Sequence, residues 1–213
     1  MNAQECLQIL RDVKDVAFAT VDDKGCPKVR IIDVMLVERG KLYFCTARGK
    51  DFYRQLMGNG QVAITGLNTR FQMARLEGRA VRLSEQKMWI DRIFKENPSM
   101  NDVYPGESRY ILEPFCVDNG QLEFFDLGKS PIERSDFALA DETVPEKGFQ
   151  ITDGCIGCGL CHQNCPQKCI YPGEELADGL QTPYVIRQEN CLHCGLCAEN
   201  CPVQAIERRG ESL

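Results

Sequence analysis

The chain has 213 residues, of which 43% are hydrophobic, and a net charge of −6. Residues 1–149 carry 21 basic and 23 acidic side chains, and residues 150–213 carry 4 and 8. This balance leaves no basic stripe to neutralise phosphates, so a nucleic-acid partner is disfavoured. The first residues are not a basic segment followed by an apolar core, and no run of the sequence is long and apolar enough to span a membrane. We therefore expect a cytoplasmic protein with reduced thiols and no membrane association.

The first 128 residues predict a domain in which a helix is followed by a meander of strands. Cys6, Leu7, Leu10 and Val13 share one face of a helix over 3–13. Turn residues bound the later apolar runs. The predicted elements are strands at 15–21, 28–37 and 41–46, a helix at 49–58, strands at 61–67 and 70–83, a helix at 85–96, and strands at 109–117 and 121–127 around Asn119-Gly120. Antiparallel strands with few helices favour a mainly β barrel.

Three segments in this order resemble the pyridoxamine 5′-phosphate oxidase-like, FMN-binding split barrel, over about residues 5–130. They are Val29-Arg30-Ile31-Ile32, the run from Leu42 to Lys50, and the run from Leu76 to Leu83 ahead of a helix. The resemblance implies an FMN-binding split β-barrel that forms a homodimer with the cofactor at the subunit interface.

The resemblance also implies which residues contact the cofactor. Arg30, Thr46 and Lys50 would surround the FMN phosphate at the start of a helix, with Arg48 as a second candidate. The backbone of 31–34 would run along the edge of the isoalloxazine ring, so the same set of contacts includes Ile31, Ile32 and Asp33. The alternative is that Arg30 is an ordinary solvated strand residue and that Thr46 and Lys50 only cap a helix.

Other positions depart from the family or exclude related activities. Met73 stands where the oxidases have a flavin-contacting Gln, and Gln72 is one residue away. The only Trp, Trp89, lies in a predicted helix, so the oxidases' substrate region has no counterpart and we do not expect oxidation of pyridoxamine phosphate. The barrel has no His, which disfavours haem. No Gly-x-Gly-x-x-Gly follows a strand, so any NAD(P)H would have to meet the flavin directly.

After a predicted linker at 129–149, residues 150–213 contain the same cysteine pattern twice, 36 positions apart. Each copy reads Cys-x2-Cys-x2-Cys-x3-Cys-Pro, and the stretches 155–170 and 191–206 are identical at nine of sixteen positions. The pattern resembles the bacterial ferredoxins that hold two [4Fe-4S] clusters. Zinc is a distant alternative, because structural zinc sites use two separated Cys pairs without the third and fourth cysteines.

In the ferredoxin resemblance, the fourth cysteine of each copy ligates the other copy's cluster. One cluster would therefore be held by Cys155, Cys158, Cys161 and Cys201, and the other by Cys191, Cys194, Cys197 and Cys165. Cys169 aligns with Ala205, which indicates a small packing residue, with a spare ligand as the alternative. The other cysteines, Cys6, Cys26, Cys45 and Cys116, have no ligand spacing.

Two classes of function fit this combination. The first is an FMN-dependent iron–sulfur oxidoreductase that passes electrons between two [4Fe-4S] clusters and FMN, to or from a small substrate. The second is a redox carrier between protein partners, without a small-molecule substrate; a redox sensor is a weaker third. The sequence identifies neither the substrate, nor the direction of electron flow, nor a catalytic acid or base.

Overall fold

The computed structural model describes residues 1–140, 142–144, 146–173 and 184–210, which form two compact units. The barrel unit comprises Met1–Phe124 and Asp136–Val144, and the cysteine-rich unit comprises Phe125–Ser135 and Pro145–Leu213. The predicted linker at 129–149 is therefore divided between the two units, and it contains strand β8 (Glu133–Leu139). In the described residues, no helix is long and apolar enough to cross a membrane.

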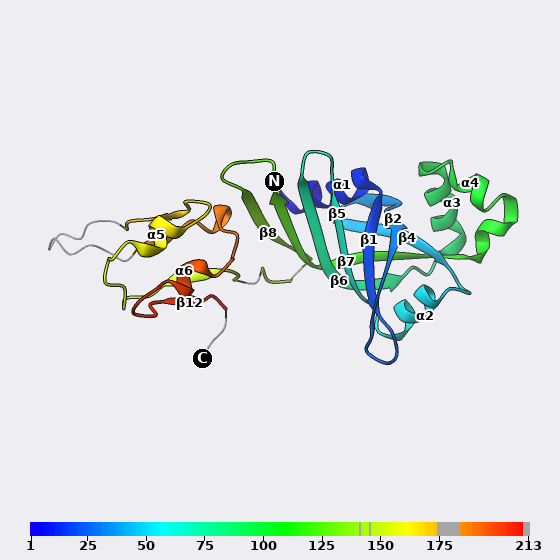
Figure 1. Cartoon of the computed structure of the whole chain (residues 1–213). Coiled ribbons are helices and arrows are strands. Elements are labelled where there is room, and N and C mark those ends of the chain that lie inside the picture. Colours follow the sequence, from blue (N-terminus) through cyan, green and yellow to red (C-terminus); the bar gives the residue numbers. More distant parts are fainter. Residues whose placement is uncertain (141, 145, 174–183, 211–213) are drawn as a thin grey trace. The chain divides into compact units, whose positions relative to one another are not determined.

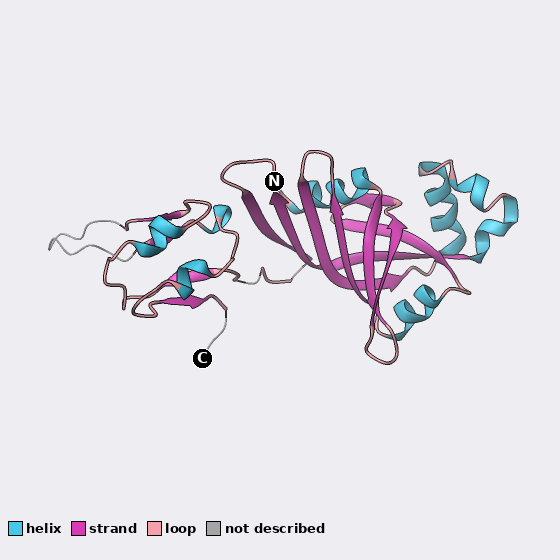
Figure 2. Cartoon of the chain, in the orientation of Figure 1, coloured by secondary structure: helices cyan, strands magenta, loops and turns pink. Residues whose placement is uncertain are grey.

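The barrel unit is built on one large antiparallel sheet with short helices, so the predicted mainly β split barrel is confirmed (Figures 1 and 2). The strand order is β2-β1-β5-β6-β7-β4-β3, and β8 pairs with β7. The strands are β1 (Asp15–Val21), β2 (Pro27–Asp33), β3 (Leu36–Glu38), β4 (Lys41–Ala47), β5 (Gln61–Leu67), β6 (Gln72–Arg82), β7 (Leu112–Asp126) and β8. The helices are α1 (Ala3–Val13), α2 (Asp51–Gly58), α3 (Gln86–Glu96), α4 (Met100–Val103) and a 3-10 turn at Gly106–Ile111.

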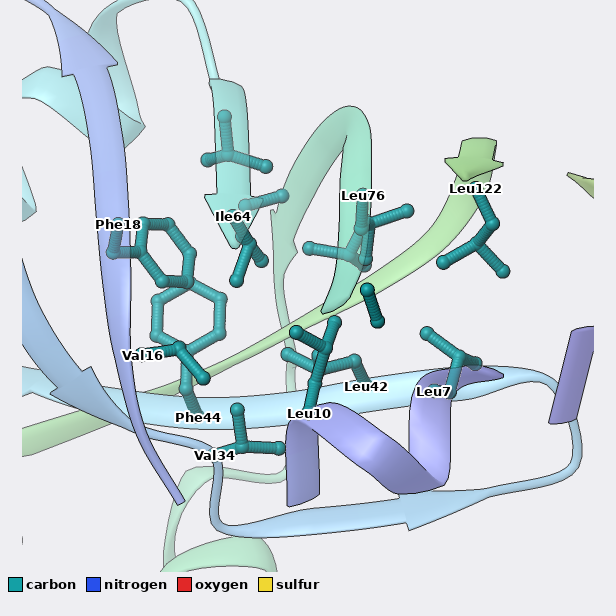
Figure 3. Close-up of a cluster of buried hydrophobic side chains, with 14 of the residues drawn as sticks. Leu7, Leu10, Val16, Phe18, Val34, Leu42, Phe44, Ile64, Leu76 and Leu122 are labelled. Atoms are coloured by element: carbon teal, nitrogen blue, oxygen red, sulfur yellow. The ribbon is translucent and has the colours of Figure 1, made fainter. Parts of the chain in front are cut away.

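The barrel core lies between the sheet and α1 (Figure 3). Helix α1 begins with a reciprocal cap, in which the Asn2 side chain accepts from the Glu5 N–H and the Glu5 carboxylate accepts from the Asn2 N–H. Leu7 and Leu10 of this helix are fully buried, and they pack into a cluster that includes Phe18 and Phe44. The scattered thiols Cys6 and Cys45 are also buried, and burial raises their pKa to about 12, so they are packing residues rather than reactive groups.

The predicted turn at Asn119-Gly120 is wrong, because β7 continues through it. Gly120 has a φ of 130°, and a Cβ at this position would lie 2.1 Å from the Glu77 carbonyl oxygen. A Cβ on Gly78 would likewise lie 2.3 Å from the Asn119 oxygen. The two glycines therefore permit close backbone contact between β6 and β7, and the Asn-Gly pair is not a hairpin here.

The cysteine-rich unit contains two small antiparallel pairs and two short helices. Strand β9 (Phe149–Ile151) pairs with β12 (Ile206–Arg208), and β10 (Ile170–Tyr171) pairs with β11 (Val185–Ile186). Helices α5 (Leu160–Asn164) and α6 (Leu196–Glu199) each follow a glycine in the left-handed conformation, Gly159 and Gly195. The two copies of the repeat thus have equivalent elements, as expected from their sequence identity.

Candidate functional site

The eight repeat cysteines line two separate cavities in the cysteine-rich unit. The first cysteine cavity is lined by Cys155, Cys158, Cys161 and Cys201. The second is lined by Cys165, Cys191, Cys194 and Cys197. Each cavity thus combines three cysteines of one copy with the fourth of the other copy. The ferredoxin resemblance implies the same crossed division of ligands.

The backbone explains why the cysteines of each copy converge. Gly159 and Gly195 have φ values of 76° and 82°, and Lys168 and Gln204, also equivalent positions, have 50° and 53°. These four residues, all in the left-handed conformation, turn the chain at equivalent positions of the two copies. Glycine adopts this conformation without steric cost, whereas Lys168 and Gln204 adopt it at some cost. The Ala205 N–H donates to Cys201 Sγ at 3.2 Å, so backbone amides already point at the sulfurs.

Most of the remaining lining of both cavities is apolar, including Ile151, Ile156 and Leu160 in the first and Phe149, Ile170 and Leu192 in the second. In the second cavity, burial raises the pKa of Cys197 to about 11. A hydrogen bond from Cys169 lowers the pKa of Cys191 to about 6. Soft sulfur donors in a dry pocket suit iron–sulfur clusters, because the thiolate is the ligand form.

In the barrel unit, Arg30 lies beside the first turn of α2. Its guanidinium donates to Thr20 Oγ1 at 2.5 Å and to Gln55 Oε1 at 2.7 Å, and it stands 4.6 Å from the centre of the Phe52 ring. All of these partners are neutral. Among the described residues no carboxylate pairs with Arg30, and burial lowers its pKa. A half-buried cation with unbalanced charge beside a helix start fits an anionic group such as a phosphate.

Thr46 and Lys50 also fit the predicted phosphate site. Thr46, near the end of β4, is 2% exposed, and its Oγ1 has no hydrogen-bond partner within the described part of the chain. Lys50 is exposed and occupies the N-cap position of α2 without a side-chain cap bond. Buried hydroxyls ordinarily have partners, so the Thr46 oxygen is suited to an acceptor or donor that is absent from the chain itself.

Arg48 is placed differently from these three residues. Its Nη1 donates to Glu113 Oε1 at 2.8 Å, and Arg82 approaches the same carboxylate. Glu113 is 6% exposed, and the charges of the two arginines balance its buried carboxylate. Arg48 therefore has a carboxylate partner, whereas the partners of Arg30 are neutral, and this makes Arg48 the weaker candidate for a phosphate ligand.

The residues predicted to run along the isoalloxazine ring lie on β2, an edge strand of the sheet. Ile31, Ile32 and Asp33 pair with β1 on one side, and no strand of the described chain pairs with the other side. Alternate peptide groups on that side are therefore open to a ligand. Gln72 lies at the start of β6 and hydrogen-bonds the Asn68 turn, so a structural role already accounts for it.

A further cavity of the barrel unit lies at the β1–β2 turn and α2. It has a volume of about 620 Å³ and is lined by Val21, Asp22, Asp23, Lys28, Asp51, Arg54, Gln55, Gly58 and Asn59. Three carboxylates line it. Gln55 and Lys28 connect it to the predicted cofactor residues, because Arg30 donates to the Gln55 side chain and to the Lys28 carbonyl oxygen. No pattern in the sequence indicates this cavity.

The fold and the paired cysteine cavities define the class: an iron–sulfur module joined to a split barrel of the flavin-binding type. Residues 154–205 match the family model of the 4Fe-4S dicluster domain. Residues 3–101 match the family model described as pyridoxamine 5′-phosphate oxidase. The chain thus joins a domain of the pyridoxamine 5′-phosphate oxidase-like family to a 4Fe-4S dicluster domain. No curated protein matches this chain.

Three solved structures are similar to this chain, and the first of them supports the fold of the barrel unit. A NimC/NimA family protein from Clostridium acetobutylicum is similar with 20% identity and a TM-score of 0.54, over 64% of this chain and 93% of that one. PhzG from Burkholderia lata 383, in complex with tetrahydrophenazine-1-carboxylic acid, has 16% identity and a TM-score of 0.49, over 63% and 80%. A pyridoxamine 5′-phosphate oxidase-related, FMN-binding protein from Nostoc punctiforme has 15% identity and a TM-score of 0.44, over 64% and 93%. At these identities the likeness concerns the fold alone.

Proposed function

We propose that the protein is an FMN-dependent iron–sulfur oxidoreductase, in which two [4Fe-4S] clusters exchange electrons with FMN in the same chain. The observation that carries this proposal is the division of eight cysteines into two crossed sets of four around two cavities of nearly equal size. When bound, each cluster would carry one electron at a time, and FMN would take up two and pass them on singly or as a hydride.

The chain's own residues supply the binding sites for this chemistry. Arg30, Thr46 and Lys50 would hold the FMN phosphate, and the open edge of β2 at 31–33 would bond the ring. The cysteines would hold the clusters in apolar pockets that exclude water. With both cofactors bound, the site would supply two electrons and two protons to a substrate, in the form of a hydride and a proton.

A homodimer is part of the proposal. Val29 and Ile31 of the edge strand β2 are 71% and 63% exposed, which is costly for two β-branched apolar side chains on one strand. A second copy that covers this strand would also enclose the ring edge that one chain leaves open. Light scattering of the purified protein tests this state, and a monomer at micromolar concentration contradicts it.

The cofactors are tested by anaerobic absorbance with quantitation of iron, sulfide and flavin. Cys158→Ser removes a proposed ligand, and Cys26→Ser is the matched control, because both thiols are exposed and Cys26 lies outside the repeat. We expect Cys158→Ser to lower iron and sulfide and Cys26→Ser to leave both unchanged. Colourless, iron-free protein, or equal iron in the two variants, would rule out the cluster assignment.

The flavin site is tested by FMN titration of cofactor-free protein. Arg30→Gln removes a charge-assisted contact worth about 1.5–3 kcal/mol, so the dissociation constant should rise by about tenfold or more. Arg48→Gln should have a smaller effect, because Arg48 is paired with Glu113. A larger loss in Arg48→Gln than in Arg30→Gln would reverse the assignment.

Electron transfer is tested by anaerobic reduction of the clusters with dithionite. Flavin bleaching at a rate independent of protein concentration supports transfer within the molecule. Flavin that stays oxidised while the clusters are reduced contradicts it. Substrate turnover then separates the oxidoreductase from a carrier that exchanges electrons only with protein partners.

A further inference from the structure

The two cysteine cavities have the same ligand spacing but different surroundings. Cys169 lines the second cavity, whereas its equivalent in the repeat, Ala205, lines the first. His193 occupies the left-handed position (φ 55°) that Gly157 (φ 70°) has in the other copy. Both differences lie next to the same cysteine, Cys191, which is a proposed ligand of the second cluster.

Cys169 is a buried thiol within a shell of ligand sulfurs. It is 2% exposed, its Sγ lies 3.5 Å from Cys165 Sγ, and its thiol also hydrogen-bonds Cys191. A cysteine that binds iron is a thiolate, which only accepts hydrogen bonds. The proton between Cys169 and these ligands therefore belongs to Cys169, and the thiol donates toward the second cluster's sulfurs.

Arg134 adds a positive charge near the same ligand, where the His193 N–H supplies a backbone donor as the Ala205 N–H does at Cys201 in the first cavity. The His193 N–H donates to Cys191 Sγ at 3.4 Å. The His193 ring Nδ1 lies 2.7 Å from Arg134 Nη1, which also donates to the Cys191 carbonyl oxygen at 3.4 Å. Arg134 is 5% exposed, so its charge acts in a poorly solvated environment. The contact with Arg134 also holds His193 in the left-handed conformation, which is unfavourable for residues other than glycine.

We propose that these residues make the two clusters unequal, so that the second cluster, held by Cys165, Cys191, Cys194 and Cys197, has the higher reduction potential and receives the first electron. Adding an electron increases the negative charge on the cluster. Donors aimed at its sulfurs and a buried cation stabilise that charge, which raises the potential. Cys169 and Arg134 are thus positioning residues that act through the ligands. This inference depends on the proposed presence of two clusters.

The test is a redox titration of the full-length protein with dithionite under EPR detection, in four variants. Cys169→Ala gives the second cavity the residue of the first, and Cys169→Ser keeps a hydroxyl donor. Ala205→Cys places the thiol in the first cavity, and Arg134→Gln removes the charge but keeps an amide donor. Iron and sulfide are measured in every sample.

Wild-type protein should titrate in two one-electron steps. In Cys169→Ala the higher step should fall until the reduced-to-oxidised ratio at fixed potential drops by about tenfold, or about 59 mV for one electron. Cys169→Ser should keep most of the wild-type value, Arg134→Gln should lower the same step, and Ala205→Cys should raise the other one. Iron content should stay at the wild-type level throughout.

Three results would overturn the inference: unchanged steps in Cys169→Ala, an equal shift in Cys169→Ser and Cys169→Ala, or loss of iron in Cys169→Ala, which would make Cys169 a ligand. These outcomes are distinct from failure of the proposed function. If the wild-type protein carries no clusters, the proposed function itself fails before any variant is compared.

Discussion

Thr46 is a buried residue whose hydroxyl has no use within the described chain. Its Oγ1 lacks a hydrogen-bond partner although the residue is 2% exposed. Thr20, by contrast, is 3% exposed and exchanges hydrogen bonds with both Arg30 and Gln55. At the scale of single residues, this contrast is the basis for proposing that Thr46 contacts a ligand and that Thr20 has a structural role.

Thr46→Val should therefore leave the thermal stability of the cofactor-free protein unchanged or higher, because it removes a desolvated hydroxyl without a partner. FMN affinity should fall about two- to tenfold, as for the loss of one hydrogen bond of about 0.5–1.5 kcal/mol. Thermal melts and FMN titration measure the two effects. Thr20→Val is the control and should lower stability. A destabilised Thr46→Val with unchanged FMN affinity would contradict the ligand role.

Asp33 and Asp15 are a like-charged pair that face each other across β1 and β2. Burial first, and then the hydrogen bond and charge of Asp15, raise the pKa of Asp33, while Lys14 at 3.6 Å opposes them. A raised carboxyl pKa favours the folded state at low pH. That benefit is lost as the pH rises through the folded-state pKa, above which the ionised pair repels.

Asp33→Asn should therefore stabilise the protein at pH 7 by about 0.5 kcal/mol, the scale of one cross-strand pair. The gain should shrink as the pH falls to about 4 and below, where the carboxyl is protonated in the wild type as well. Urea unfolding at several pH values measures this. The exposed Asp23→Asn is the control and should show no such trend, and a gain that does not depend on pH would point to a cause other than charge.

At the scale of elements, the contact between β6 and β7 depends on two glycines. A side chain at Gly120 would combine a φ of 130° with a Cβ 2.1 Å from the Glu77 oxygen, and backbone atoms cannot yield as a flexible side chain does. Helix α2 contains a contrasting glycine, Gly58, whose Cβ would meet nothing within 4 Å. The same substitution should thus have opposite effects at the two positions.

Gly120→Ala should destabilise the barrel by about 3 kcal/mol or more, through strain and the loss of close strand contact. Gly58→Ala should stabilise it by about 0.5–1 kcal/mol, because alanine restricts the unfolded chain and favours the helix. Chemical denaturation of both variants gives the comparison. A Gly120→Ala protein of wild-type stability would show that β6 and β7 can separate locally at no cost.

These elements also show what the sequence could predict. Periodicity located α1 and β1 at their observed bounds, because a single amphipathic face determines each. The sequence pattern did not predict the continuity of β7, because an Asn-Gly pair typically indicates a hairpin turn. The close contact of Gly120 with Glu77 and Gly78, which explains the glycine, is visible only in the structure. The ferredoxin resemblance implies the two crossed sets of cysteines, which line the two cavities. The pairing of Arg48 with Glu113 joins positions 65 residues apart, which no local pattern encodes.

At the scale of the whole molecule, the two units have unequal means of folding. Among the described residues, the main core cluster of the barrel unit has 21 buried residues, whereas the core cluster of the cysteine-rich unit has eight, of which four are cysteines. The strands of the cysteine-rich unit have at most three residues in the described part of the chain. A core of this size ordinarily requires metal or disulfides, so the energy of cluster binding would supply most of the order of this unit.

Removal of iron with a chelator should therefore unfold the cysteine-rich unit and leave the barrel folded. We expect limited proteolysis of the iron-depleted chain to cleave rapidly within residues 146–210 and to spare residues 1–124, and a thermal melt to retain the barrel transition. Reconstitution with iron and sulfide should restore protection, because the ligands cross between the two copies and fold them together. Protection that persists without iron would mean that the apolar lining alone orders this unit, and simultaneous loss of the barrel transition would mean that the two units fold as one.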